Sequence, residues 1–556
     1  MATDRAGFAT VGLSADRLSG TDTRPHGATD RATVSLASRV HTATNCDWTR
    51  EHAKVIQSAV KRIVHILLAT AVLSGCSVGP NYRPRSATEL GVPDAWSVTA
   101  APTREDLTRW WRNFDDPVLG QLVEQAAAAN LDLAQAVARL RQAREQLVVS
   151  QSSLFPTISG SGGFSRSEAI RGGGSTLTLP DGTVTTAGGG GRSNFSLGLD
   201  ASYQLDLFGG IRRGVEASRA QYEAAGFDYA TALLSVQGEV ARNYVLARAY
   251  QAQLENAKAS LAIQDDNLEI AGFRVQAGLV SSVDQEQARA SRAQTAANIP
   301  QVEQQYNAAV SRIGVLTGQA PGALKPLLAA VKPIPKGPAS VGADIPANVL
   351  RQRPDVRAAE RNLAAATAQI GVAKAQLYPA LSISGSLDAN AGNIGGLFDA
   401  ITGGLFAGIS QAIFNGGRLN AQVRSSRAGA DAAFAAYKQT VLTALEDVEN
   451  AVVALQSAQE RERQFAIAYD AASNSTLLAR SQYRSGLTDF TTLNTQEASL
   501  ISARNGLVQA RSDKATALIA LYAALGGGWD PAVTPTVDTT PELNATSAAP
   551  GPAGTN

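Results

Sequence analysis

The alternation of apolar and polar side chains is strictest between Asn194 and Leu207, where every second residue is apolar. Residues 381–388 follow the same rule, and residues 157–165 and 398–413 follow it less cleanly. A period of two predicts β-strands with one apolar and one polar face. Segments of this length match a membrane barrel that has lipid outside and water inside. On the strands alone, the alternative is a half-buried antiparallel sheet.

Two much longer stretches lack the residues that end helices. Residues 212–275 and 419–484 contain no proline and few glycines. About 64 helical residues at about 1.5 Å each extend for on the order of 95 Å, which suits a coiled coil or a tunnel wall. Each stretch ends near a glycine, Gly278 or Gly486, from which a helix of about 35 residues is predicted to return. The sequence therefore predicts two antiparallel helical hairpins whose tips lie far from the strands.

These elements occur twice in the same order, which indicates an internal duplication. The first copy spans residues 119–318, the second spans residues 349–527, and a proline-rich linker at residues 319–348 joins them. Each copy is predicted to contain a helix, two strands, a long helix, a tight turn and a returning helix. A Leu-aromatic-Pro triplet precedes the first strand of each copy, and a Gly-Gly pair precedes each long helix.

Four strands per chain are too few to close a barrel, because known membrane barrels begin at about eight. An open sheet edge in lipid leaves backbone groups unpaired, at a cost of several kcal/mol for each. The chain is therefore expected to associate. Side chains fill the lumen of an eight-stranded barrel, so a conduit favours three or more chains, although this reasoning does not select three by itself.

Composition narrows the chemistry that the chain can perform. The net charge of +1 provides no general attraction to nucleic acid. The two cysteines exclude a disulfide framework, and all four histidines precede Cys76. A chain cut before Cys76 has no histidine, so the usual transition-metal sites and nucleophile–base pairs are missing. Since no local carboxylate cluster suggests other catalysis, we expect neither an enzyme nor a bound metal.

The amino-terminal region has the pattern of a sorting signal. Within residues 55–75, a Lys-Arg pair precedes an apolar run of about eleven residues, which is too short for a bilayer span of about 20. The Leu-Ser-Gly-Cys sequence that follows resembles the lipobox of bacterial lipoproteins. This resemblance implies that Cys76 becomes the first mature residue and carries N-acyl and diacylglycerol chains, with no other cofactor. The alternative is an apolar core helix with a buried free cysteine.

Four further motifs stand out along the chain, at Gly75–Pro84, Trp110–Leu119, Arg353–Glu360 and Phe414–Arg418. In combination they resemble the outer-membrane efflux lipoproteins of the TolC/OprM type, NodT subgroup. The similarity extends from Leu73 to about Gly528. It is specific because the motifs occur together and in order.

The resemblance implies an α+β membrane protein that works as a homotrimer. Each chain would contribute four strands to a twelve-stranded barrel in the outer membrane and its helical hairpins to an α-barrel tunnel in the periplasm. The implied partners are outer-membrane lipid, a periplasmic adaptor (membrane fusion protein) and an inner-membrane transporter of the resistance–nodulation–division (RND) class. The implied function is a passive conduit that exports small molecules such as drugs and toxic compounds.

The resemblance also assigns roles to the helical tips. The turns at Gly278 and Gly486 would contact the adaptor. The entrance would be closed by residues around the second turn, namely Tyr483, Arg484, Asp489, Thr492 and Thr495. Tyr483 matches a tyrosine that holds the closed state in a relative, and a role in helix packing is the alternative. In that relative, two aspartates form a cation-binding ring at positions that correspond to about Thr492 and Thr495. This chain has threonine at both positions and so departs from the acidic ring. Asp489 is the nearby substitute.

The flanking segments are assigned from composition. Residues 1–54 are predicted to be disordered or a mis-assigned extension, because they are polar and lack any apolar period. For residues 76–118, the resemblance implies a lipidated tether and an equatorial segment. Residues 528–556 are rich in Pro, Thr and Ala and are predicted to be a disordered tail.

Two other functions fit part of the pattern. The same architecture serves type I protein secretion, although the lipobox and the NodT-like motifs favour small-molecule efflux. A structural coiled-coil lipoprotein has no use for amphipathic strands that are duplicated between long helices. Conductance across a planar bilayer separates a channel from such a lipoprotein.

Overall fold

The computed structural model describes residues 77–98, 107–168, 175–187, 192–338, 341–342 and 344–538. The amino-terminal extension, the predicted signal peptide, Cys76 and most of the glycine-rich stretches on either side of residues 175–187 lie outside these residues. Among the helices that are described, none combines the length and the hydropathy that a bilayer crossing requires.

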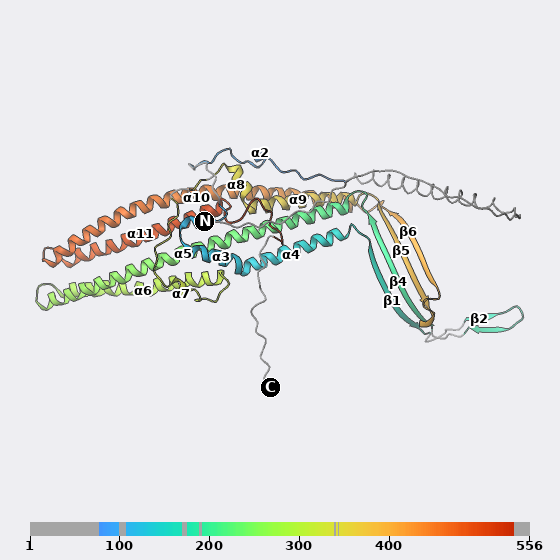
Figure 1. The fold of residues 1–556 in the computed structure, drawn as a ribbon, viewed down its shortest axis with the longest axis horizontal. Helices are drawn as coiled ribbons and strands as arrows, with labels where there is room; N and C mark the ends of the chain where they lie inside the picture. The colour runs from blue at the N-terminus through green and yellow to red at the C-terminus, as the bar shows by residue number, and fades with distance from the viewer. Residues whose placement is uncertain are drawn as a thin grey trace, which may run out of the picture. The chain divides into compact units, whose positions relative to one another are not determined.

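Two units with the same order of elements make up most of the described chain (Figure 1). The first unit consists of α4 (Leu131–Ser152), β1 (Thr157–Ser167), β4 (Arg192–Leu205), α5 (Gly210–Gln276) and α6 (Ser282–Leu316). The second unit consists of α9 (Pro354–Ala375), β5 (Ala380–Ala391), β6 (Ile401–Ser410), α10 (Arg418–Arg484) and α11 (Phe490–Ala524). The long helices have 67 residues each and the returning helices 35 each, so the units match element by element. The predicted fold of helical hairpins with four strands is confirmed.

Shorter elements precede, join and interrupt the two units. They are α2 (Ala87–Leu90), the 3-10 helix η1 (Trp110–Phe114), α3 (Pro117–Ala129), β2 (Ser175–Thr178), β3 (Val184–Ala187), α7 (Lys325–Leu328), α8 (Pro346–Gln352) and η2 (Ile394–Gly396). β2 and β3 pair as a short antiparallel hairpin in the segment between β1 and β4. Threonine-rich segments on both sides of a Pro-Asp-Gly turn explain it, because β-branched residues favour strands and this triplet favours a turn.

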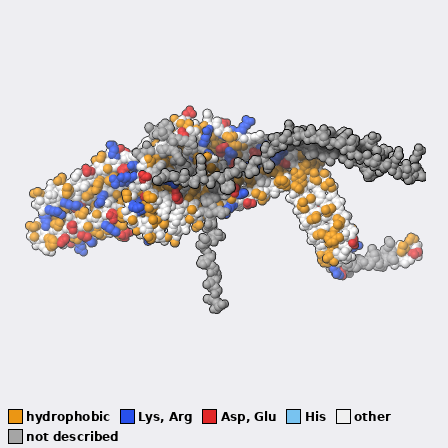
Figure 2. Space-filling view, in the orientation of Figure 1, with side chains coloured by type: hydrophobic (Ala, Val, Ile, Leu, Met, Phe, Trp, Pro, Cys, Tyr) orange, Lys and Arg blue, Asp and Glu red, His pale blue; other side chains and the backbone are white. Residues whose placement is uncertain are grey.

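The four main strands form one antiparallel sheet in the order β1-β4-β5-β6, and the two units meet at the β4–β5 pair. Residues that lie opposite each other share a face: Leu199 lies opposite Leu387, and Asp200 lies opposite Ser386. Most apolar residues of the four strands therefore gather on one face, where Leu405 is 84% exposed and where Figure 2 shows hydrophobic side chains on the sheet. Phe406 of β6 is an exception, because it lies opposite Ser384 on the other face. The other face carries mostly serine and glycine. β1 and β6 are the edges of this sheet.

Two strands are shorter than the alternation predicts. β4 ends at Leu205 because the Asp206 carboxylate accepts a hydrogen bond from the Arg212 N–H at 2.8 Å and so opens α5. β6 does not begin at Phe398, because the Asp399 N–H donates to the Gly396 carbonyl oxygen at 3.1 Å and closes a turn there. In both places a local hydrogen bond outweighs the continuing alternation of side chains.

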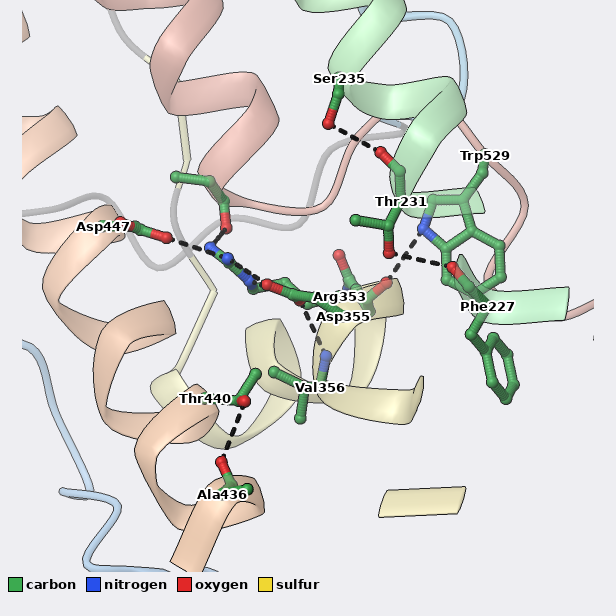
Figure 3. A network of polar contacts seen from close by, with 12 residues as sticks. Phe227, Thr231, Ser235, Arg353, Asp355, Val356, Ala436, Thr440, Asp447 and Trp529 are labelled. Carbon is green, nitrogen blue, oxygen red and sulfur yellow. Dashed lines mark hydrogen bonds and ion pairs between the residues drawn. The ribbon is translucent and has the colours of Figure 1, made fainter. Parts of the chain in front are cut away.

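Arg353 connects the helices of the second unit (Figure 3). It lies between α8 and α9, is 8% exposed, and binds the two Asp355 carboxylate oxygens at 3.0 and 2.6 Å. It also binds Asp447 of α10 at 3.0 Å and the carbonyl oxygen of Ala524, at the end of α11, at 2.9 Å. Burial by itself lowers the pKa of Arg353, but the hydrogen bonds and negative charge of Asp355 and Asp447 raise it overall. Arg353 therefore remains charged and links α9, α10 and the end of α11.

The beginning of the carboxy-terminal segment is packed against the helices. Trp529 is 6% exposed, and its ring meets Phe227 of α5 edge to face with centroids 6.0 Å apart. The prediction of disorder was therefore wrong for residues 528–538, because one large aromatic side chain anchors a segment whose average composition is polar. Residues 539–556 lie outside the described part of the chain.

The start of the tether is held between backbone segments. The Val78 N–H donates to the carbonyl oxygen of Phe208, just after β4, at 3.1 Å. Gly79 has a φ of 107°, and a Cβ at this position would lie 2.6 Å from the Cα of Gly371 in α9. Only glycine permits this backbone conformation and this approach, so Gly79 fixes where the tether meets the junction of sheet and helices.

We expect Gly79→Ala to release the start of the tether. The left-handed backbone alone costs about 1–3 kcal/mol for a residue with a side chain, and the contact with Gly371 adds a clash. Hydrogen exchange at the Val78 amide should therefore accelerate. Gly91→Ala is the matched control, because Gly91 has a φ of 78° but a Cβ added there would have no neighbour within 4 Å. Equal exchange at Val78 in both variants would contradict the close contact.

Candidate functional site at the helical tips

Both helical hairpins turn at a glycine, as predicted. Gly278 has a φ of 66° and Gly486 a φ of 73°. In each turn, the N–H of the following leucine donates to the carbonyl five residues earlier, at 2.9 Å for Leu279 and 2.8 Å for Leu487. These bonds close the helix end in the manner that favours glycine. The two leucines are 69% and 78% exposed, so each tip presents an apolar side chain.

The polar residues predicted for the entrance serve the local structure of α11 or lie exposed beside it. The Asp489 carboxylate caps α11 by accepting from the Thr492 N–H at 2.7 Å, and the hydrogen bonds from Thr492 hold the pKa of Asp489 below its usual range. Because the folded-state pKa is the lower one, the cap stabilises the fold at neutral pH and is lost as the pH falls through that pKa. The Thr495 hydroxyl donates to the Thr491 carbonyl at 2.8 Å. Arg484, Thr492 and Thr495 are exposed.

Tyr483 lies in an apolar cluster between the two hairpins. It is 2% exposed, and its ring meets Phe490 with centroids 5.9 Å apart at an interplanar angle of 65°. Arg274 of α5 places its Cζ 4.5 Å from the ring centroid and donates to the Tyr483 carbonyl oxygen at 3.2 Å. The Tyr483 hydroxyl is buried and has no hydrogen-bond partner among the described residues. In the single chain Tyr483 therefore packs the hairpins together, and its role as a gate stays a prediction.

A buried carboxylate, Glu497 of α11, makes a second connection between the hairpins. It is 2% exposed. Its Oε2 accepts from the Asn267 amide at 2.6 Å and from the Gln264 amide at 3.2 Å, both on α5. Its Oε1 accepts from the Arg480 guanidinium of α10 at 3.0 Å. One carboxylate thus holds three helices together.

The sequence contained a signal for Glu497 that apolar periodicity does not capture. Phe490, Leu493 and Glu497 follow the spacing of a single helix face, and all three are buried. A charge on a buried face requires hydrogen-bonding partners from another helix. Nothing in the sequence identified those partners, because they lie on the other hairpin.

Weaker polar contacts continue along the same interface. The Ser291 hydroxyl donates to the Asn494 side-chain oxygen at 2.9 Å, and the Thr491 hydroxyl donates to that of Gln287 at 3.5 Å. A cavity of about 60 Å³ lies beside Tyr483. Within the described residues, no group of three or more His, Cys, Asp or Glu side chains could hold a metal ion. The described residues of this site hold the two hairpins together through individual hydrogen bonds.

Comparison with known proteins identifies the family. The profile of the outer membrane efflux protein family matches residues 122–319 and 345–527, which is more than half of the chain. Nodulation protein T of Rhizobium leguminosarum bv. trifolii is 33% identical over 465 residues, which cover 83% of this chain and 96% of that protein. The pyoverdine export outer membrane protein OpmQ of Pseudomonas aeruginosa is 30% identical over 444 residues, which cover 79% of this chain and 92% of that protein.

Solved structures share the fold. The outer-membrane channel OprN superposes with a TM-score of 0.72 at 34% identity and covers 82% of this chain and 100% of its own. The open state of the Neisseria gonorrhoeae MtrE outer membrane channel superposes with a TM-score of 0.70 at 25% identity and covers 82% of this chain and 99% of its own. The chain therefore belongs to the outer membrane efflux protein family, and it is an outer-membrane efflux channel without enzymatic activity.

Proposed function

We propose that this channel works as a homotrimer and is the passive outer-membrane conduit of a tripartite system that exports small molecules. A periplasmic adaptor and an inner-membrane RND transporter are its partners. The observation that carries the proposal is a sheet with one apolar face, one polar face and two open edges, β1 and β6. Unpaired backbone in lipid costs several kcal/mol for each group, so copies of the chain must pair these edges. Three copies supply twelve strands, which exceeds the size of about eight that leaves no passage.

We also propose that Cys76 carries the lipid. Ser77, the first described residue, packs so closely on Gly209 that a Cβ at Gly209 would lie 2.9 Å from the Ser77 Cα. Together with the bond from Val78 to Phe208, this contact holds the start of the tether at the end of β4. A lipid on Cys76 would reach the bilayer at the level where the apolar face of the sheet begins. The mass of the mature amino-terminal peptide tests this modification.

The tips are proposed as the entrance and the docking point. The exposure of Leu279 and Leu487 supports contact between the adaptor and the turns at Gly278 and Gly486. The cluster around Tyr483 supports a closed state in which the two hairpins are held together. Around it we place Arg484, Asp489, Thr492 and Thr495.

Arginine substitutions on the two faces of the sheet test the conduit. We expect Leu405→Arg, on the apolar face, to cost about 2–4 kcal/mol at the bilayer midplane and to abolish trimers in the outer membrane. Ser386→Arg, on the polar face beside Asp200, should leave insertion intact and shift the ion preference toward anions. Trimer yield in isolated outer membranes and reversal potentials in planar bilayers measure the two effects.

The two variants control for each other, because both introduce the same side chain into the same sheet. If Leu405→Arg inserts normally and Ser386→Arg does not, the lipid and water faces are reversed. If trimers of the unmodified protein form but carry no current, the conduit itself is refuted.

A further inference from the structure

A pocket of about 470 Å³ lies far from the tips, where both units and the tether meet. Its walls come from α2 and the residues after it, α5, α8, α9, α10 and the packed carboxy-terminal segment. This volume falls within the range of about 300–1,000 Å³ that is usual for small-molecule sites. None of the predicted entrance residues lines it.

Two arginines of this pocket form no ion pair with a carboxylate of the described residues, and one of them, Arg351, is exposed to solvent. Arg351 of α8 and Arg357 of α9 line the pocket, and neither forms an ion pair within the described part of the chain. Arg357 donates only to carbonyl oxygens, those of Arg351 at 2.7 Å and Pro531 at 2.8 Å. Its Cζ lies 5.3 Å from the ring centroid of Trp529. Burial lowers the pKa of Arg357 from its usual range.

The carboxylates of the pocket are already engaged by a different arginine. Arg361 binds Glu360 at 3.0 Å and Glu223 at 3.4 Å, and the Tyr82 hydroxyl donates to Glu360 at 2.9 Å. The remaining cation, Arg85, pairs with Glu89 at 3.4 Å. Glu360 also attracts Arg357 without forming an ion pair with it. The pocket is lined by four arginines and two glutamates, so an excess of positive charge remains in it.

The rest of the lining is mostly apolar, with Tyr437 and Thr534 adding hydroxyl groups. Leu90, Leu350 and Val356 are buried there, and Phe227 and Val441 add to the same wall. A ligand that satisfies both parts of the pocket carries an anionic group for the guanidiniums and an apolar body for this wall. A carboxylate matches the planar fork of arginine and can accept two parallel hydrogen bonds from it.

We propose that this pocket binds a small amphiphilic carboxylate, whose head is held by Arg351 and Arg357 and whose body packs on the apolar wall. Such a ligand touches α5 of the first unit, α9 and α10 of the second and the residues around α2, so it cross-links the duplicated halves. A ligand that binds only the folded protein stabilises it by mass action. Binding should therefore raise the thermal unfolding midpoint. The proposal does not depend on the conduit function.

Water-soluble 4-phenylbutyrate is the probe, and isothermal titration calorimetry on the full trimeric protein is the measurement. The neutral 4-phenylbutyramide and the cationic 4-phenylbutylamine keep the apolar body and change only the head. We expect binding of the carboxylate, binding at least about tenfold weaker for the amide, and no binding of the amine. Equal affinity for carboxylate and amide, or no heat from the carboxylate up to its solubility limit, overturns the proposal.

Variants place the site. Arg351→Gln should weaken 4-phenylbutyrate binding at least about tenfold and abolish the rise in unfolding midpoint. It removes one of the two charged groups that donate hydrogen bonds to the ligand carboxylate. Arg357→Gln should do the same, and Arg351→Gln carries the test if Arg357→Gln does not fold. Arg83→Gln is the control, because Arg83 is exposed on the tether and does not line the pocket. Unchanged affinity in Arg351→Gln, or an equal loss in Arg83→Gln, overturns the assignment.

Discussion

Alanine in place of Arg353 is expected to lower the free energy of unfolding by about 3 kcal/mol. The substitution leaves Asp355 and Asp447 without their cation and the Ala524 carbonyl without a donor. Loss of one partner from a buried ion pair costs about 3–5 kcal/mol. The two aspartate side chains are 31% and 46% exposed, so water compensates part of the loss and the effect lies at the lower end.

Chemical denaturation of the detergent-purified protein, followed by circular dichroism, measures this difference. Arg353→Lys should be intermediate, because lysine keeps the charge but cannot form the paired bonds to Asp355. Arg463→Ala is the control, since Arg463 forms only an exposed pair with Glu460 and its loss should not change stability measurably. A loss in Arg463→Ala equal to that in Arg353→Ala would show that the buried position of Arg353 is irrelevant.

The helices and strands were predictable because their signals are local. The alternation from Asn194 fixes which side chains of β4 share a face, whatever packs around the strand. The absence of proline permits the length of α5 and α10, although α6 continues through Pro300. Gly278 and Gly486 fix the turns, because few other residues adopt a positive φ. These features require no knowledge of the partners in space.

Contacts between distant segments were not predictable in the same way. Glu497 and Gln264 are 233 residues apart in the sequence, and nothing in either helix alone shows that they meet. Trp529 lies in a stretch whose average composition indicates disorder, yet its ring packs against α5. The pocket around Arg357 likewise exists only because several distant segments converge. Composition and period describe averages, whereas these sites depend on single residues.

Glu497→Ala is expected to open the entrance. It removes the acceptor of Asn267 and Gln264 and the anionic partner of Arg480, all within the interface between the hairpins. Removing one partner of a buried ion pair costs about 3 kcal/mol, so the free energy that holds the two hairpins together should fall by about this amount. Cells should become more sensitive to vancomycin, and single-channel conductance in planar bilayers should rise. Glu303→Ala, which changes an exposed glutamate on α6, should alter neither.

Tyr483 allows the packing role to be separated from a role of its hydroxyl. Tyr483→Ala removes the ring contacts with Phe490 and Arg274 and should leak large solutes in the same assays. Tyr483→Phe keeps those contacts and should be silent, because the hydroxyl has no partner among the described residues of the chain. A leak in Tyr483→Phe would mean that the hydroxyl bonds across a subunit boundary in the trimer. Unchanged conductance in both Glu497→Ala and Tyr483→Ala would show that the contacts between the two hairpins do not close the channel.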